Sequence, residues 1–244
     1  MDYLRHQLLA RSWIGFDLDD TLHEFRRASR AATNEILNEI SSRYGIPYLP
    51  LEEEYYKILK LKTANAFSDG KTSFEYRKER FTSLLNSFSL PSDDEPAMTA
   101  MLELYEDTLT KSLKLKLGAI DLLSTIKRLG KNIVIITEGP HDAQERTLQA
   151  LGIIDHVDFL ATTNEFQLAK PEGLFSKVLT HLQISAEEMA YIGDCEARDI
   201  IPATGQGILT IHLDEANQSS LDAFPPRINS LEVLQGLLAN TANH

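Results

Sequence analysis

The chain is poor in cysteine, in positive charge and in long apolar runs. Its single cysteine, Cys195, excludes an internal disulfide, and a lone thiol among carboxylates is predicted to be structural. Lys and Arg number 24 against 36 Asp and Glu, so the net charge is −12. Without a basic stripe, this balance disfavours binding to nucleic-acid phosphates. No apolar run approaches the roughly 20 residues that span a membrane.

The N-terminal segment has little of a secretion signal. Asp2, Arg5 and Arg11 interrupt any apolar signal-peptide core, and we therefore expect a cytoplasmic protein that binds neither nucleic acid nor membrane. The 244 residues are 43% hydrophobic, which suits one large domain or one domain carrying an insertion. We expect a monomer or a dimer.

Short apolar runs with the composition of buried strands recur along the chain. They occupy residues 13–16, 132–137, 157–162, 189–193 and 207–213. Helix-like segments of about 10–15 residues separate the later runs. Strands alternating with helices predict an α/β fold, with a Rossmann-like parallel five-stranded sheet and helices on both faces.

The connection after the first strand is different. From residue 23 to residue 116 the sequence is helical in character and has no comparable strand, and it is too long for a loop. It predicts an inserted helical domain at 23–116, with a core domain formed by 1–22 and 117–244. The natural place for such an insertion is a lid above the first strand end.

Polar residues follow the predicted strands at the edge where open parallel sheets bind ligands. Because the carboxyl ends of parallel strands meet at one edge, we expect these residues to converge on a single site. In chain order they are Asp17, Asp19, Asp20, Thr137, Glu138, Gly139, Lys170, Asp194 and Asp199.

The clustered carboxylates predict a metal and a phosphate. Two charges about 4 Å apart repel by about 4 kcal/mol at an effective dielectric near 20, so either protons or a cation must join them. Oxygen ligands without a His or Cys cluster favour Mg²⁺ over zinc. Lys170 would reduce the repulsion between an attacking carboxylate and a phosphate, while Thr137 and the following N–H groups would bind phosphoryl oxygens. Asp19 is placed to protonate a leaving oxygen.

The chain resembles the haloacid dehalogenase (HAD) superfamily of aspartyl-phosphate hydrolases. Four motifs occur in the family's order, with the insertion where that family places a helical C1 cap. They are "DLDDT" at 17–21, the apolar strand ending in Thr137, Lys170 before Pro171, and "GDCEARD" at 193–199.

The resemblance implies a role for each matching residue. Asp17 would be the nucleophile and Asp19 the acid/base. Asp17, the main-chain carbonyl of Asp19 and Asp194 would bind Mg²⁺, and Asp199 would act through water or by orienting the metal site. Thr137, Glu138, Gly139 and Lys170 would bind phosphate. The implied activity is Mg²⁺-dependent hydrolysis of a small phosphorylated metabolite, such as a nucleotide, a sugar phosphate or an organic phosphate.

Some positions depart from the family or lie outside its motifs. Glu138 stands where the family commonly has asparagine, and a carboxylate there is unfavourable unless it points away or contacts a cation. Arg77 and Arg80 in the insertion are candidates for contact with a substrate anion. The histidines have no metal-ligand spacing and are predicted at surface or hinge positions; they include His23, His141 and His156.

Other functions stay open at this point. A phosphomutase would share all four motifs, whereas a receiver-like signalling domain has similar strand-end residues but is small and uncapped. A catalytically silent phosphate-binding protein would not need both Asp17 and Asp19. A dehalogenase needs no acid at the second position, so Asp19 argues against it.

Overall fold

The computed structural model describes residues 2–63 and 67–239, and its centre is a parallel sheet in the order β3-β2-β1-β4-β5-β6. The strands are β1 Trp13–Phe16, β2 Asn132–Thr137, β3 Phe159–Thr162, β4 Met189–Gly193, β5 Leu209–Leu213 and β6 Arg227–Ile228. The α/β prediction is confirmed, but the count of five strands is wrong. The sixth strand has only two residues, which pair in parallel with His212 and Leu213, and so short a run leaves no apolar signal.

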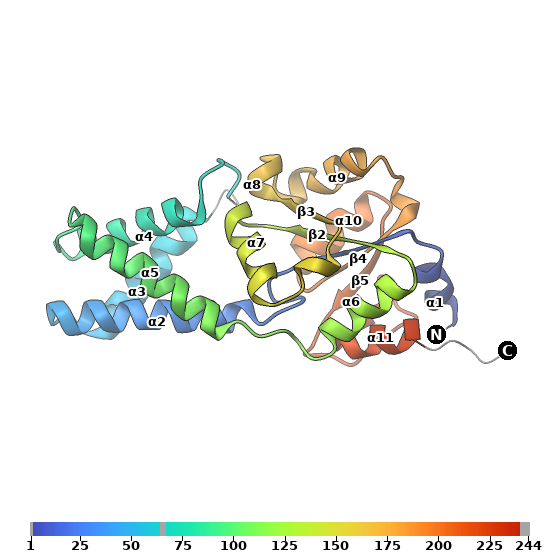
Figure 1. Cartoon of the computed structure of the whole chain (residues 1–244), viewed down its shortest axis with the longest axis horizontal. Helices are drawn as coiled ribbons and strands as arrows, with labels where there is room; N and C mark the ends of the chain where they lie inside the picture. The colour runs from blue at the N-terminus through green and yellow to red at the C-terminus, as the bar shows by residue number, and fades with distance from the viewer. Residues whose placement is uncertain (1, 64–66, 240–244) are drawn as a thin grey trace.

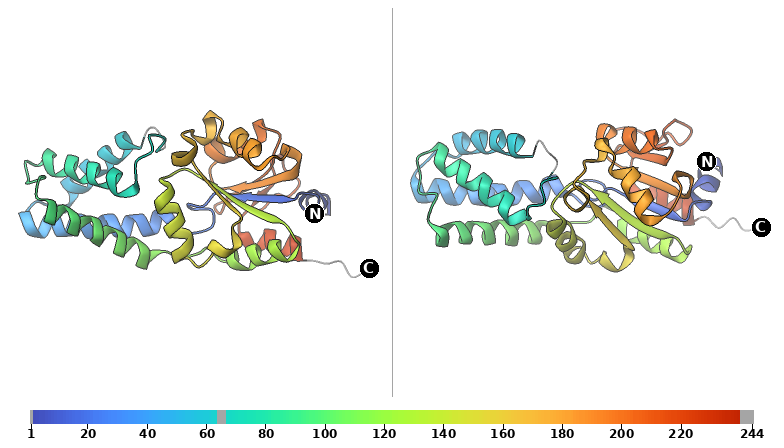
Figure 2. Two further views of the ribbon diagram at one scale, coloured as in Figure 1. Left: turned by 45° about the horizontal axis from the view of Figure 1, so that its top comes forward. Right: turned by 90° about the horizontal axis from the view of Figure 1, so that it is seen from above.

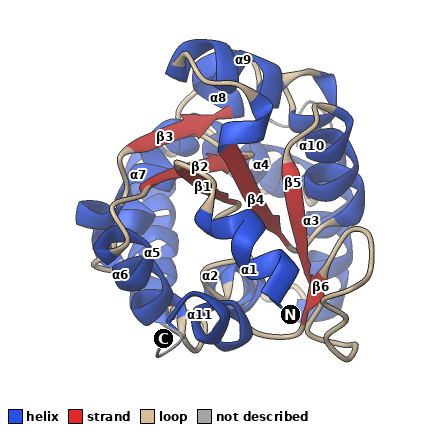
Figure 3. Cartoon of the chain, turned by 90° about the vertical axis from the view of Figure 1, so that its right-hand side faces the viewer, coloured by secondary structure: helices blue, strands red, loops and turns tan. Residues whose placement is uncertain are grey.

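The two faces of the sheet are covered by different helices (Figure 3). One face packs against α1 Asp2–Leu9, α6 Ala119–Arg128, α7 His141–Ala150 and α11 Leu231–Ala239, and the other against α9 Leu174–Leu182 and α10 Ile201–Gly205. Alternation along β2 serves both layers, because Ile133 and Ile135 belong to the first cluster whereas Val134 and Ile136 belong to the second. Helices on both faces are therefore confirmed.

Short turns complete the core. They are α8 Thr163–Phe166, the 3₁₀ turns Ile154–His156, Lys170–Glu172 and Ala186–Glu188, and a π-helical turn Glu196–Ile200. Two of these turns, the one at Lys170 and the one at Asp199, lie at the carboxyl ends of the strands. Both predicted site residues, Lys170 and Asp199, therefore lie in regular turns and not in irregular loops.

The central strand β1 has no side chain at Gly15. Gly15 in β1 leaves room for the ring of Tyr191 in β4, since a Cβ at this glycine would lie 2.8 Å from that ring. The Tyr191 hydroxyl then lies 2.9 Å from the carbonyl oxygen of Ile136, beneath the strand ends. A small residue in β1 thus fixes an aromatic support under the site.

In the described part of the segment between β1 and β2, four helices form a bundle. They are α2 Phe25–Tyr44, α3 Tyr48–Lys62, α4 Ser73–Ser87 and α5 Glu95–Ser112. Their apolar faces share a hydrophobic cluster of their own, which includes Ile36, Tyr55, Phe81 and Met101. Figures 1 and 2 show this bundle standing beyond α7, away from the body of the sheet. The segment between β1 and β2 is therefore helical and has a hydrophobic cluster of its own.

The chain enters and leaves the bundle at one place. His23 pairs with Leu115 in an antiparallel bridge, Glu24 N donates to Lys114 O at 2.9 Å, and Lys116 N donates to Leu22 O at the same distance. The two connections therefore run side by side next to the end of β1.

None of the described helices, within 2–63 and 67–239, combines the length and apolarity needed to cross a membrane.

Candidate active site

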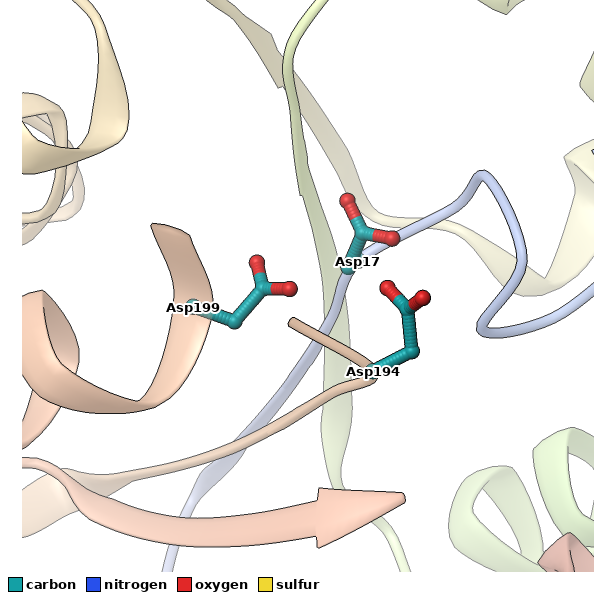
Figure 4. A group of neighbouring side chains, drawn as sticks. All are labelled: Asp17, Asp194 and Asp199. Carbon is teal, nitrogen blue, oxygen red and sulfur yellow. The ribbon is translucent and has the colours of Figure 1, made fainter. Parts of the chain in front are cut away.

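Three aspartates converge at the carboxyl ends of β1 and β4 (Figure 4). Asp17 follows β1 directly, and its N–H donates to the carbonyl of Ile192 at 2.9 Å, so the sheet itself holds its backbone. Asp17, Asp194 and Asp199 each offer a carboxylate oxygen, and these oxygens lie within 4.8 Å of one another. The structure therefore brings together the acidic residues that the sequence placed after two different strands.

Lys170 lies between two of these carboxylates. Its Nζ is 2.5 Å from Asp17 Oδ1 and 2.5 Å from Asp199 Oδ1, and all three side chains are buried. Burial alone would lower the pKa of Lys170, but the charges of Asp17 and Asp199 outweigh it and raise the pKa above its ordinary value. The side chain is therefore a buried ammonium ion.

The surroundings of Asp17 raise the pKa of its carboxyl group. Burial raises the pKa of Asp17 to about 8, an effect that Lys170 opposes and that the charges of Asp199 and Asp19 reinforce. An additional cation beside these carboxylates would favour the ionised form. The donor set fits such a cation, because it consists of carboxylate oxygens, which Mg²⁺ and similar hard ions prefer.

Asp194 and Asp199 are held differently. Asp199 Oδ2 accepts a hydrogen bond from Cys195 N at 3.0 Å, and its Oδ1 lies 3.1 Å from the Tyr191 hydroxyl. Gly193 gives it room, because a Cβ there would lie 2.5 Å from the Asp199 side chain. Asp194 is more open, and its Oδ2 accepts from Arg26 Nη2 at 3.3 Å. Asp199 is thus a fixed support, while Asp194 faces the side from which the inserted helices approach.

Both carboxylate oxygens of Asp19 have hydrogen-bond partners. Oδ1 lies 2.9 Å from His23 Nε2, and Oδ2 accepts from Gln144 Nε2 in α7 at 3.2 Å. Gly139 leaves space for this amide, since a Cβ there would approach Gln144 Nε2 to 2.6 Å. His23 was expected at a surface or hinge position. Its side chain is fully buried, so the surface alternative is wrong, and it lies at the connection between core and insertion.

The loop after β2 places the remaining core candidates. Thr137 is buried at the strand end, with its Oγ1 accepting from Gln144 Nε2 at 3.4 Å, and Gly139 N donates to Thr163 Oγ1 at 3.1 Å. Glu138 Oε1 accepts from the backbone N of Lys170 at 3.2 Å, and Oε2 accepts from Arg198 at 3.3 Å. The unusual carboxylate therefore contacts a cation.

A cavity of ≈ 570 Å³ connects this acidic end to the inserted helices. Asp17, Asp19, Lys170 and Asp194 line the core end. The helical bundle contributes, among others, Ser29, Tyr55, Tyr76, Arg77, Arg80 and Tyr105. Both predicted arginines thus border the same space as the predicted nucleophile.

Ionic contacts join the bundle to α7. Ser73 at the start of α4 donates through its N and Oγ to Asp142, at 2.9 and 2.7 Å. Arg146 donates to Glu106 in α5 at 3.0 Å and to Ser73 Oγ at 2.8 Å. Partial burial would raise the pKa of Asp142, but the two hydrogen bonds from Ser73 and the hydrogen bond and charge of Arg146 outweigh it and lower the pKa. This carboxylate is therefore ionised at neutral pH.

Sequence reasoning missed several of these partners. His23 had a usable signal, since it stands four residues after Asp19 in the same short segment. Gln144 and Arg198 had none, because a glutamine in an amphipathic helix and an arginine beside an acidic motif are ordinary solvated residues. Their roles follow from where α7 and the π-helical turn pack.

A parallel sheet with a buried Asp–Lys centre at its strand ends, next to a cavity that an inserted helical bundle also lines, defines a Rossmann-like α/β protein that binds its ligand at the strand ends. Residues 12–206 match the family model of the haloacid dehalogenase-like hydrolases. The chain belongs to this family, which confirms the resemblance seen in the four motifs.

Curated relatives match over most of their length. A glyceraldehyde 3-phosphate phosphatase of Methanocaldococcus jannaschii is 29% identical, over 92% of this chain and 96% of the relative. The pyrimidine 5'-nucleotidase PynA of Streptococcus pneumoniae is 26% identical, over 84% of this chain and 86% of the relative. Among solved structures, YfnB of Bacillus subtilis, reported bound to magnesium, has a TM-score of 0.70 at 23% identity, over 93% of this chain and 98% of YfnB. This last likeness supports the fold.

Proposed function

We propose that this chain is a Mg²⁺-dependent phosphatase that hydrolyses a small phosphomonoester through a phosphorylated Asp17. The observation that carries the proposal is the pairing of two unlike carboxylates. Asp17 is buried against the ammonium of Lys170, while Asp19, two residues on, is held by His23 and Gln144. Environments that separate the roles of two nearby carboxylates are what nucleophilic attack combined with proton transfer requires.

The first half of the reaction follows from these positions. Asp17 attacks phosphorus, the ester P–O bond breaks, and Asp19 gives its proton to the leaving oxygen. Lys170 reduces the repulsion between the attacking carboxylate and the phosphoryl oxygens. Among the described residues, only Asp17 and Asp199 are hydrogen-bonded to Lys170 Nζ, which leaves its third N–H for a phosphoryl oxygen.

The second half reverses the role of Asp19. Its carboxylate accepts a proton from water, the water oxygen attacks phosphorus, and the Asp17–phosphorus bond breaks to release inorganic phosphate. His23 and Gln144 keep the Asp19 oxygens directed at the same point in both steps. The metal would be held by Asp17, Asp194 and the main-chain carbonyl of Asp19, with Asp199 beside them, and when bound it would supply charge neutralisation at the phosphoryl group.

The cavity and the relatives support a small substrate. A space of ≈ 570 Å³ between the sheet and the bundle suits a metabolite, and a folded phosphoprotein would not fit beneath the helices. The names of the two relatives, a glyceraldehyde 3-phosphate phosphatase and a pyrimidine 5'-nucleotidase, point the same way. We propose that residues 23–116 act as the cap and that the protein works as a monomer or a dimer.

A panel of phosphorylated metabolites tests the function directly. We expect the purified protein with Mg²⁺ to release phosphate from 4-nitrophenyl phosphate and, more efficiently, from at least one nucleoside monophosphate, sugar phosphate or short organic phosphate. Measured kcat/KM values rank the substrates. Isomerisation of a sugar phosphate that depends on a bisphosphate activator, with little phosphate release, would instead identify a phosphomutase.

Metal removal is expected to abolish activity reversibly. EDTA should reduce the rate to less than about a hundredth, because the attack would lose several kcal/mol of charge stabilisation, and Mg²⁺ should restore it. Mg²⁺ should also raise the melting temperature of the EDTA-treated protein, since it binds the folded state. Asp194→Asn should weaken both responses. Full activity in EDTA, with no thermal shift on adding Mg²⁺, would contradict a metal at this site.

Gln144→Met is expected to impair proton transfer more than phosphoryl transfer. The change keeps the size of the side chain but removes the donor to Asp19 Oδ2. For an alkyl phosphate, whose leaving oxygen needs a proton, kcat should fall roughly tenfold, and for 4-nitrophenyl phosphate much less. Gln149→Met, at an exposed position of the same helix, is the matched control and should leave both rates unchanged. Equal losses for the two esters would argue against a role in holding Asp19.

A further inference from the structure

Arg80 is a buried cation to which the described part of the chain gives no counter-ion. It lies in α4 with its side chain bordering the cavity, and only 9% of the residue is exposed. Its Nε is buried without a hydrogen-bond partner, and no carboxylate of the described residues forms an ion pair with it. A guanidinium cannot shed its proton in a protein, so this charge stays in a poorly solvated place.

Neighbouring cations on the same helix are in a different situation. Arg77, one turn earlier, forms an ion pair with Glu106, and its guanidinium carbon lies 4.5 Å from the centre of the Tyr105 ring. Lys78 faces solvent and pairs with Glu95 at 2.9 Å. Each of these charges has a carboxylate partner from another helix of the bundle. The two arginines that were equivalent candidates in the sequence are therefore not equivalent in the structure.

Nearby phenols do not supply the missing charge. Tyr55 lies close enough to feel the charge of Arg80, but burial raises the pKa of its hydroxyl above the ordinary tyrosine value. Tyr55 is thus neutral at physiological pH. The Tyr105 hydroxyl is 3.2 Å from Ser29 Oγ and is likewise occupied by an uncharged partner. An isolated buried charge is costly unless an anion joins it.

We infer that Arg80 binds a second anionic group of the substrate, a carboxylate or another phosphate, while the scissile phosphate lies at Asp17. This inference rests on the proposed phosphatase function and adds the substrate class. The cavity that Arg80 borders is continuous with the space around Asp17 and Lys170. The planar guanidinium fork suits both carboxylate and phosphate oxygens. A second anion on the substrate would neutralise the charge of Arg80 at the outer end of the cavity.

Matched esters provide the test. Glycerol 3-phosphate, glycerate 3-phosphate and propane-1,3-diol bisphosphate share a three-carbon chain but end in a hydroxyl, a carboxylate and a second phosphate. We expect kcat/KM of the wild-type protein to be roughly tenfold to a hundredfold higher for one of the two esters with an anionic far end than for glycerol 3-phosphate, the range of a charged hydrogen bond. The preferred ester shows whether the second anionic group that Arg80 binds is a carboxylate or a phosphate.

Variants then assign the preference to Arg80. Arg80→Met should lower kcat/KM for the preferred ester far more than for glycerol 3-phosphate or 4-nitrophenyl phosphate, and so abolish the selectivity. Arg80→Lys, which keeps the charge, should retain part of it. Lys78→Met is the matched control, because Lys78 lies two positions from Arg80 on the solvent-facing side of the same helix, and it should leave the selectivity unchanged.

Each failure has a separate meaning. Wild-type protein that turns over all esters without preferring an anionic end would overturn the inference about Arg80, and so would a preference that survives in both Arg80 variants. These results would leave the phosphatase function intact. No phosphate release from any ester, including 4-nitrophenyl phosphate, would contradict the proposed function itself. If Arg80→Met does not fold, Arg80→Lys and the wild-type comparison still decide the question.

Discussion

Asp17→Asn should lower kcat for every phosphomonoester by at least roughly 10³-fold while the fold is retained. The amide has nearly the shape of the carboxylate, but it is a poor nucleophile. Lys170 keeps one carboxylate partner, because Asp199 also lies 2.5 Å from its Nζ. Phosphate release and the thermal unfolding curve, measured on the same preparation, check both parts. Asp121→Asn, at an exposed position of α6, is the control and should behave as wild type.

Trapping the intermediate makes the Asp17 test specific. Wild-type protein quenched in acid during turnover should carry one phosphoryl group on the peptide that contains Asp17, and the Asn variant should carry none. An unmodified peptide in the wild type, together with substantial turnover by the variant, would show that the attacking group is not this carboxylate.

Lys170→Met should produce the other large effect, a joint loss of activity and stability. Removing the ammonium leaves Asp17 and Asp199 facing each other in a buried site, and breaking a buried ion pair typically costs about 3–5 kcal/mol of unfolding free energy. The rate should fall by at least roughly a hundredfold, because the attacking carboxylate is no longer shielded from the phosphate. Denaturant unfolding and steady-state kinetics measure the two losses.

Lys177→Met is the matched control for this variant, because Lys177 is an exposed lysine in the following helix, α9. It should leave both the unfolding free energy and the rate unchanged. A Lys170→Met protein as stable as wild type would contradict the buried ion pair. Unaltered kinetics would show that the lysine does not face the phosphate.

The parts of the fold that the sequence could predict are those with strong local signals. Strands such as Asn132–Thr137 are buried on both faces and therefore read as continuous apolar runs. The short strand Arg227–Ile228 has no such signal, because it is an edge strand defined only by its pairing with β5. The helix Asp2–Leu9 was read only for its charges, since its apolar face becomes meaningful when Leu4 and Leu8 pack beneath the sheet.

The same distinction separates the site residues. Asp17, Lys170 and Asp194 were predictable because parallel topology carries strand-end residues to one edge. The partner of Glu138 was not, because Arg198 is 60 positions away and approaches only through the packing of the π-helical turn. Arg77 differs from Arg80 because it pairs with Glu106 in another helix, and the spacing of residues within α4 does not predict that pairing.

The paired connections at His23 and Leu115 have a consequence for how such a protein can diversify. Since the helical bundle departs from the sheet and returns to it at one place, changes within the bundle need not disturb the strands that carry Asp17 and Asp194. Selection can act on the helices that line the outer end of the cavity while the proposed catalytic residues stay as they are. The proposed chemistry and the recognition of the substrate can therefore evolve separately, because different stretches of one gene encode the sheet and the bundle.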